Sequence, residues 1–159
     1  MLPIFQKIEA NIDHSFYVDH IRFKYFPNPL HFHPEIEILL VIEGTGTRFV
    51  GDSVERFGPG SFVMIGQNVP HLWHSDEKYF KKNSLNSEVI YILFNTEFFG
   101  KDFWQMAETT QINKLLELSQ RGIKLTLQHH DELIELMKSI VKSSGVRRII
   151  LLLLILEHA

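Results

Sequence analysis

The chain has 159 residues, of which 45% are hydrophobic, and this length and composition are typical of one ordinary globular domain. Its formal net charge is −3 at pH 7, without a long run of one sign, so we do not expect this segment to bind nucleic acid by itself. Without cysteine there are no disulfides and no thiol nucleophile, and without a signal peptide or an apolar run of ~20 residues we expect a cytoplasmic protein with no membrane partner.

The N-terminal residues are predicted to form an arm followed by a strand. Residues 1–14 lack a clear period and are predicted to form an irregular arm. Residues 15–26 alternate in the manner of a strand, because Tyr17, Ile21, Phe23 and Tyr25 share one parity. The Pro-Asn-Pro sequence at 27–29 ends this strand.

Residues 31–43 give the clearest strand pattern. Since successive side chains of a strand face opposite ways, the even and odd positions form two faces. The even face is apolar throughout: Phe32, Ile36, Ile38, Leu40 and Ile42. The odd face is polar at one end and apolar at the other: His31, His33, Glu35, Glu37, Leu39 and Val41. We therefore expect one face to pack in a core and the other to line a cavity with a polar mouth.

Further short strands are predicted at 46–50, 53–57, 61–65 and 88–94. The Gly51-Asp52 pair is a hairpin signal, and the Gly-Pro-Gly sequence at 58–60 is another turn. Strands of this length separated by turns every 8–12 residues favour a sandwich or barrel over about residues 15–100.

After about residue 100 the hydrophobic period becomes helical. Helices are predicted around 112–116, 133–141 and 146–158, and residues 123–127 could form one short strand. Because the last helix is apolar on all sides, one side is expected to face a partner, and the abrupt apolar end suggests a piece of a longer chain. We predict a homodimer formed through these helices, with the following dimerisation residues: Leu133, Met137, Ile149, Leu152, Leu153 and Leu156.

Four residues have the spacing of a metal site. His31 and His33 point the same way on a strand, Glu37 joins them, and His71 can approach from a neighbouring strand. Three histidines and one carboxylate suit a divalent Zn, Ni, Fe or Mn ion with open positions for water or a ligand. The alternative is that these side chains line a polar pocket or bind an organic ligand without a metal.

Three other residues are candidates for the same pocket. Glu35 shares the parity of the ligands, although Pro34 can displace the strand there. Trp73 shares the parity of His71 and can wall the pocket or belong to the core. Arg48 can face into the barrel and pair with a ligand carboxylate.

The segment from His31 to Ser75 resembles the cupin superfamily. The pattern His-x-His, three residues, Glu, six residues, Gly is present in full, ending at Gly44, and the second motif is present in part through Gly60 and His71. The resemblance implies a mainly β fold, a double-stranded β-helix (jelly-roll) barrel followed by C-terminal α-helices. The sequence departs from the second motif with these residues: Gly66, Asn68 and Ser75.

The longer run from His31, "HFHPEIEILLVIEGTGTRFVGDSVERFGPGSFVMIGQNVPHLWHS", resembles the N-terminal sensor domain of AraC-type transcription regulators. The resemblance covers roughly residues 15–158. It implies a cupin barrel at 15–100, a mostly helical dimerisation and linker segment at 101–159, and an effector, often a sugar, bound inside the barrel. It also implies that DNA is contacted only through a C-terminal helix-turn-helix domain, which this chain does not include.

Two other functions compete with this one. A stand-alone cupin enzyme, a metal-dependent dioxygenase or isomerase, would use His31, His33, Glu37 and His71 for its metal, but no general base is evident beyond the ligands. A storage or carbohydrate-binding barrel would need neither catalysis nor regulation. The leading hypothesis is the sensing and dimerising module, without catalytic activity, and a fold alone does not decide among the three.

Overall fold

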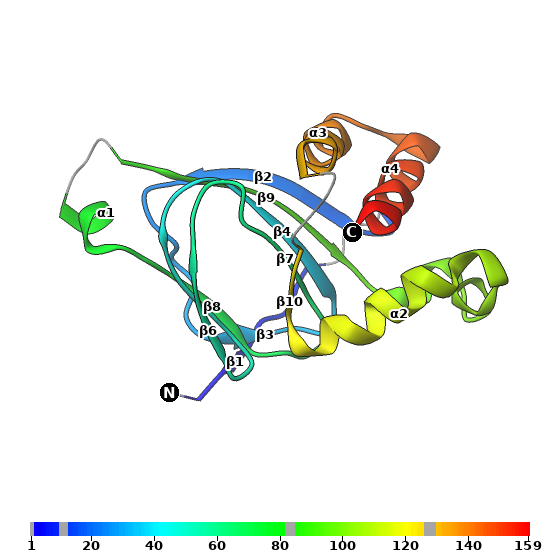
Figure 1. The fold of residues 1–159 in the computed structure, drawn as a ribbon, viewed down its shortest axis with the longest axis horizontal. Coiled ribbons are helices and arrows are strands. Elements are labelled where there is room, and N and C mark those ends of the chain that lie inside the picture. The colour runs from blue at the N-terminus through cyan, green and yellow to red at the C-terminus, as the bar shows by residue number, and fades with distance from the viewer. Residues whose placement is uncertain (1, 10–12, 82–84, 126–129) are drawn as a thin grey trace.

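The computed structural model describes residues 2–9, 13–81, 85–125 and 130–159. Two five-stranded sheets face each other and form a barrel, with helices outside one of them (Figure 1). The first sheet has, in order, β1 (Ile4–Phe5), β3 (His31–Phe32), β8 (His71–Ser75), β5 (Gly46–Val50) and β6 (Ser53–Phe57). The second has β10 (Ile123–Lys124), β7 (Phe62–Ile65), β4 (Ile36–Glu43), β9 (Ser87–Phe94) and β2 (Tyr17–Phe23). The predicted jelly-roll barrel with C-terminal helices is confirmed.

Three of the four α-helices follow β9 in the sequence, and the short α1 lies between β8 and β9. Their bounds are α1 (Glu77–Lys81), α2 (Thr110–Leu118), α3 (His130–Val141) and α4 (Gly145–His158). The 3-10 turns are η1 (Thr96–Phe99), η2 (Phe103–Gln105), η3 (Ala107–Thr109) and η4 (Ser119–Arg121). The three predicted helices are confirmed as α2, α3 and α4. The strand predicted at 123–127 is found only at its start, and its residues 126 and 127 lie outside the described residues.

The N-terminal arm does not behave as a wholly irregular segment. Ile4 and Phe5 pair in parallel with His31 and Phe32, so the arm adds an edge strand to the first sheet. The sequence contains no strand signal there because two residues are too few for a period to show. The division of the chain at 14/15 and 100/101 stays a prediction.

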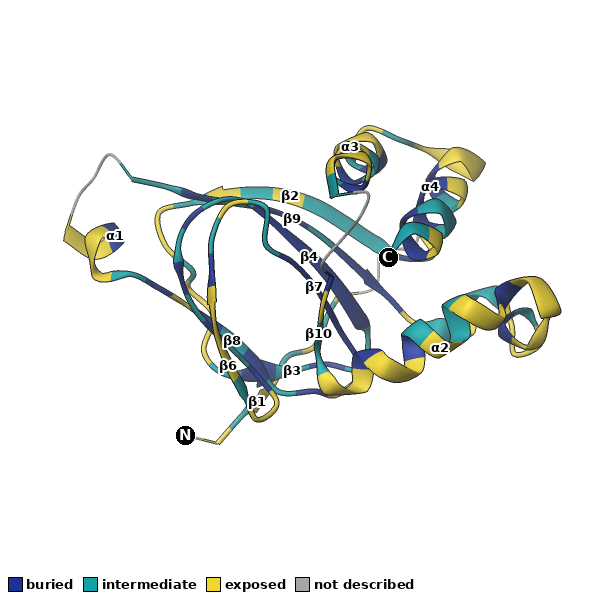
Figure 2. Ribbon diagram, in the orientation of Figure 1, coloured by how far each residue is buried: buried dark blue, intermediate teal, exposed yellow. Residues whose placement is uncertain are grey.

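The alternation along β4 separates two hydrophobic cores. Ile36, Ile38 and Leu40 belong to a core between the second sheet and the helices. Leu39 and Val41 belong to a core inside the barrel, together with Trp73 of the first sheet. The three inner strands of the second sheet, β4, β7 and β9, are mostly buried as a result (Figure 2). The two predicted faces are confirmed within β4, where the odd face leads from the apolar interior to Glu37. The single strand predicted over residues 31–43 is wrong, because the chain leaves the strand at residues 33–35, around Pro34, and its two parts, β3 and β4, pair in different sheets.

The helical layer packs on this chain's own sheet. α3 contacts β2, β9 and α4, and α4 also contacts α2. Four of the six residues predicted to mediate dimerisation are at most 2% exposed within the protomer: Leu133, Met137, Leu152 and Leu156. For these four residues the prediction is wrong, because they are buried inside the protomer and not at a dimer interface. The outer face of the second sheet is apolar, and these side chains belong to the core that shields it from water.

The remaining apolar surface of α4 is a narrower stripe. Val146 is 71% exposed and Ile150 is 50% exposed, while Ile149 and Leu153 are half-buried. Val146, Ile150 and Leu153 are spaced by four and three residues, so they lie on one side of the helix. A homodimer through this stripe stays a prediction.

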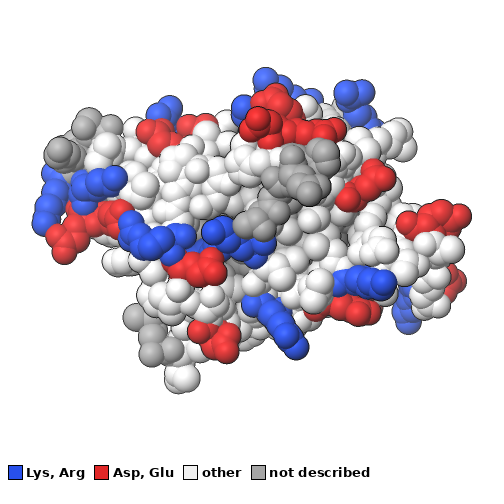
Figure 3. All heavy atoms as spheres, in the orientation of Figure 1, with Lys and Arg blue, Asp and Glu red and all other residues white. Residues whose placement is uncertain are grey.

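The surface carries mixed charge. On the face shown in Figure 3, acidic and basic side chains lie next to one another rather than in separate patches. Arg56 and Asp76 illustrate this arrangement with two hydrogen bonds of 2.7 and 2.8 Å. Within the part of the chain that the structure describes, no helix has the length and apolar character needed to cross a membrane.

Replacing Gly46 by alanine is expected to destabilise the barrel by about 1–3 kcal/mol or more, the usual cost of overpacking. A Cβ at Gly46 would lie 2.1 Å from the carbonyl oxygen of His74 and 2.7 Å from the Phe57 ring. Gly58→Ala is the control, since the nearest atom there is Thr45 Cγ2 at 4.0 Å. Urea unfolding of both variants checks this, and equal midpoints would contradict it.

Candidate ligand and metal site

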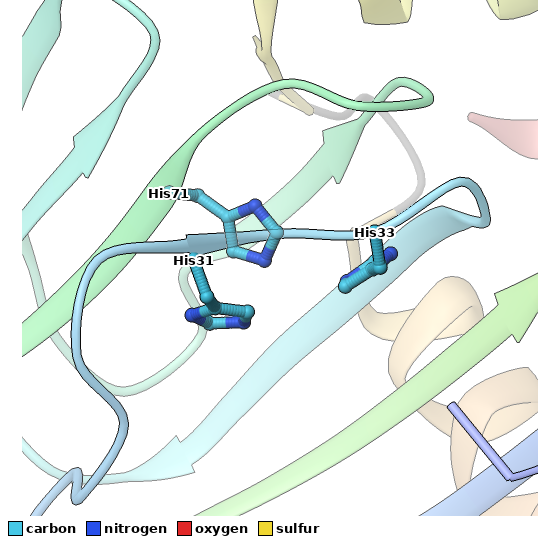
Figure 4. Close-up of side chains that lie close together, drawn as sticks. All are labelled: His31, His33 and His71. Carbon is cyan, nitrogen blue, oxygen red and sulfur yellow. The ribbon is translucent and has the colours of Figure 1, made fainter. Parts of the chain in front are cut away.

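The three histidines predicted to bind metal converge at one end of the barrel (Figure 4). His31 lies on β3 opposite His71 of β8, and His33 follows β3. Their candidate ligand atoms all lie within 4.8 Å of one another. All three side chains are buried, with exposed fractions of 6%, 3% and 1% for His31, His33 and His71.

The backbone fixes the orientation of each imidazole ring. His31 Nδ1 donates to Pro29 O at 2.8 Å, and His71 Nδ1 donates to Val69 O at 2.8 Å. His33 Nδ1 lies 3.2 Å from Glu35 O. Because a carbonyl oxygen can only accept, the proton of each neutral ring is placed on Nδ1. The Nε2 lone pairs are then free to bind a metal, as in histidine ligands oriented by a second hydrogen bond.

Glu37 completes the predicted set of four. It is the first odd residue of β4, and its Oε2 lies 3.2 Å from His33 Nε2 and 3.3 Å from His71 Nε2. Two ligands each about 2.1 Å from one ion are about 3.0–3.4 Å apart, depending on the angle between them. His71 Nε2 is also buried without a hydrogen-bond partner among the described residues. The donor set therefore fits a divalent transition metal.

The ionisation of the site follows from burial and the close charges. Burial by itself raises the pKa of Glu37, but the neighbouring His71 and His33 hold this pKa well below its usual value. Burial lowers the pKa of His31, and the neighbouring His71 lowers it further. Burial also opposes the charged form of His71, but Glu37 outweighs it and raises the pKa of His71. Glu37 is thus a carboxylate and His31 a neutral ligand at neutral pH.

A cavity of about 290 Å³ opens beside this cluster. His31, His33 and Glu37 line one part of it, and apolar side chains from β2, β4 and β9 line much of the rest. Its full lining comprises Gln6, Ile8, Ile21, Phe23, Phe26, Pro27, Asn28, His31, His33, Glu37, Leu39, Trp73, Val89, Tyr91 and Leu93. A small concave site with a few convergent polar groups in an apolar wall is the usual form of a ligand pocket.

The three additional pocket candidates have different positions. Trp73 is 5% exposed and lines the cavity, as predicted. Glu35 lines a separate hollow of about 150 Å³, and its Oε2 lies 3.5 Å from His33 Nδ1. Arg48 is buried but pairs with Glu55, its direct cross-strand neighbour on β6. The prediction that Arg48 meets a ligand carboxylate is wrong, because Glu55 already supplies the carboxylate.

Sequence reasoning missed the contributions of the arm and of β9. Gln6 and Ile8 line the cavity, although the pattern of residues 1–14 gives no sign of it. Tyr91 and Leu93 line it from β9, while Ile92 faces the helices. The segment 88–94 is apolar on both faces, so only its pairing with β4 decides which residues face the cavity.

The comparisons with known proteins agree with this fold. Residues 25–79 match the family model described as Cupin domain. ToxT from Vibrio cholerae, solved bound to (E)-4-(8-methylnaphthalen-1-yl)but-3-enoic acid, is similar with a TM-score of 0.51 and 17% identity, over 81% of this chain and 48% of that one. ToxT with an unsaturated fatty acid bound is similar with a TM-score of 0.50 and 14% identity, over 86% of this chain and 48% of that one.

A cupin 2 conserved barrel domain protein from Rhodopseudomonas palustris is also similar, with a TM-score of 0.41 and 13% identity, over 55% of this chain and 57% of that one. The chain thus spans about half the length of these similar structures. No curated protein matches it. The match over residues 25–79 and the two-sheet barrel together show that this chain has the cupin fold.

Proposed function

We propose that this chain is the small-molecule-sensing module of an AraC-type transcription regulator. The observation that carries the proposal is the extent of the shared fold. The similarity to ToxT, an AraC-family regulator, includes 81% of this chain, which is more than the cupin barrel alone. The "HFHPEIE" and "NVPHLWH" runs resemble the same regulators. The proposal includes a small-molecule effector that binds this chain and a further domain that binds DNA.

The cavity and the helices share the second sheet, which offers a physical route for signalling. Leu39 of β4 and Leu93 of β9 line the cavity. Ile38 and Ile92, on the same strands, face the core that includes α3 and α4. A ligand that shifts these strands therefore changes the packing under α4. A ligand also contacts Ile8, so it can favour one placement of the arm. Regulation would then be a shift between populations of two arrangements.

A divalent metal at His31, His33, Glu37 and His71 would act as a Lewis acid that binds an oxygen of the effector. The protein residues do the rest of the work. The backbone carbonyls that accept from the Nδ1 atoms hold the rings in place, and the apolar wall excludes water around the bound molecule.

The test of the sensing function uses the full-length gene product and its upstream DNA. Fluorescence anisotropy would measure DNA affinity with and without a molecule that binds the cavity. We expect a change of about 5–150-fold, the usual range of coupling between two sites. A molecule that binds the cavity without changing either DNA affinity or dimer geometry would argue against the regulator.

The homodimer has its own test. Ile150→Glu places a charge on the exposed stripe of α4, so we expect it to convert a dimer into a folded monomer. Light scattering gives the mass, and circular dichroism shows whether the helices are retained. Glu157→Gln, on the exposed surface near the end of α4, is the control and should leave the mass unchanged. A wild-type protein that is monomeric at micromolar concentration would refute the dimer.

A metal-dependent cupin enzyme is the second candidate, and one observation favours it. The three histidines form a buried donor set, and Glu37 lies against two of them. His31, His33 and Glu37 line the cavity where a substrate would sit. Oxidation or isomerisation of a small molecule that stops with a chelator and returns with added metal would support this function. If removal of the metal left the rate of any observed reaction unchanged, a metal-dependent enzyme would be excluded.

A further inference from the structure

The wall of the cavity is suited to an apolar, flat body. Phe26 packs edge-on against Phe23, with ring centroids 4.8 Å apart, and nearly parallel to Trp73 at 6.2 Å. Aliphatic side chains complete this wall: Ile8, Ile21, Leu39, Val89 and Leu93. Aromatic and aliphatic walls bind apolar surface with a gain that grows with the area removed from water.

One hydrogen-bond donor of the wall lacks a partner. The indole nitrogen of Trp73 is fully buried and makes no hydrogen bond within the described residues. The other tryptophan differs, since Trp104 Nε1 donates to Thr96 O at 2.7 Å. A buried unsatisfied donor costs about 1–3 kcal/mol. A ligand oxygen would remove that cost once the Trp73 ring turns its nitrogen, which is enclosed in this structure, toward the cavity.

This donor stands next to the histidine cluster. The Trp73 ring meets the His71 ring edge-on, with centroids 5.7 Å apart, two residues along β8. A metal held by the cluster also prefers oxygen as a further ligand. The side-chain amides of Gln6 and Asn28 add polar groups to the lining. The histidine cluster with its metal and the neighbouring indole therefore form one polar part of the cavity that is suited to oxygen acceptors.

A sugar fits this cavity poorly. It carries a hydroxyl on nearly every carbon, and each hydroxyl buried against Phe23, Phe26 or Leu39 would lose its water without a replacement partner. The cavity volume of about 290 Å³ lies at the lower end of the range of ligand pockets, so the occupant is small.

The geometry points to a compact amphipathic acid as the ligand: an apolar, preferably aromatic body against Phe23, Phe26 and Leu39, and a carboxylate head facing the histidine cluster and the indole N–H of Trp73. This inference rests on the proposed sensing function and specifies its effector class. Without a metal, Glu37 would repel a carboxylate, so the head binds when the cluster holds its cation.

The test uses the whole chain with one equivalent of Zn²⁺ and four probes. trans-Cinnamate has the expected body and head, cinnamylamine has the same carbon skeleton with a cationic head, acetate has the head without the body, and D-glucose is a polyol. Two-dimensional NMR of the indole N–H groups reads the cavity at Trp73, and Trp104 serves as the reference in the same spectrum.

We expect trans-cinnamate to move the Trp73 signal saturably and to leave the Trp104 signal in place, while the other three probes move neither at the same concentration. Trp73→Phe keeps a ring but removes the donor, so it should weaken cinnamate binding about tenfold, equivalent to about 1.4 kcal/mol. Trp104→Phe should leave that affinity unchanged.

Tighter binding of D-glucose or cinnamylamine than of cinnamate would overturn the inference, and so would a Trp73 signal that none of the four probes moves. The DNA measurement on the full-length gene product separates this inference from the proposed function. Cinnamate that binds without affecting DNA would remove the regulator and keep the ligand class. A polyol that binds and changes DNA affinity would support the regulator and exclude the amphipathic acid as its ligand class.

Discussion

Leu152→Ala is expected to lower the free energy of unfolding by about 2–5 kcal/mol, a large part of the 5–15 kcal/mol that a domain of this size usually has. Leu152 is 0% exposed and belongs to the core between α4 and the second sheet. Removing its side chain loses apolar burial and leaves a cavity that the sheet cannot close, because the strands are held by their hydrogen-bond pairing. Urea unfolding followed by circular dichroism measures the change.

Leu153→Ala is the matched control for this prediction. It removes the same atoms from the next residue of α4, whose side chain is only half-buried. We expect less than half of the loss seen for Leu152→Ala. Equal losses for the two variants would mean that both faces of α4 are covered in solution, which would instead favour the homodimer.

His71→Ala is expected to abolish the stabilisation of the protein by zinc. A ligand that binds only the folded state at 100 times its dissociation constant stabilises it by about 2.7 kcal/mol. We therefore expect Zn²⁺ to raise the unfolding temperature of the wild-type chain and a chelator to reverse the rise. Removal of His71 deletes one of the three imidazole ligands and leaves Glu37 without one of its two partners.

His74→Ala provides the control, since His74 lies on the same strand but is exposed on the opposite face. It should respond to zinc as the wild type does. Thermal unfolding at a series of zinc concentrations checks both variants. A His71→Ala protein whose unfolding temperature still rises with zinc as in the wild type would show that the cluster is not the metal site. The effect should weaken at acid pH, because protons compete for the histidine nitrogens.

The barrel and its two faces can be predicted from the order of the residues. Period-two alternation arises from the geometry of a strand, so it predicts the two faces of β4 correctly. It does not predict the break at residues 33–35 that places β3 in the other sheet. The spacing of His31, His33 and His71 is likewise sufficient to predict that they lie together, and Glu37 lies next to two of them. The helical stripes of α2 and α3 can also be predicted, because each of these two helices keeps a polar side.

Contacts between residues that are distant in the sequence depend instead on the tertiary structure. Arg48 faces inward, as its parity suggests, but its register opposite Glu55 turns it into an ion pair. Leu152 is covered by the chain's own sheet, and a pattern in one helix cannot reveal how much cover another element supplies. Ile8 of the arm and Tyr91 of β9 reach the cavity through pairings distant in sequence. Contacts of this kind depend on register and packing, which a one-dimensional period does not encode.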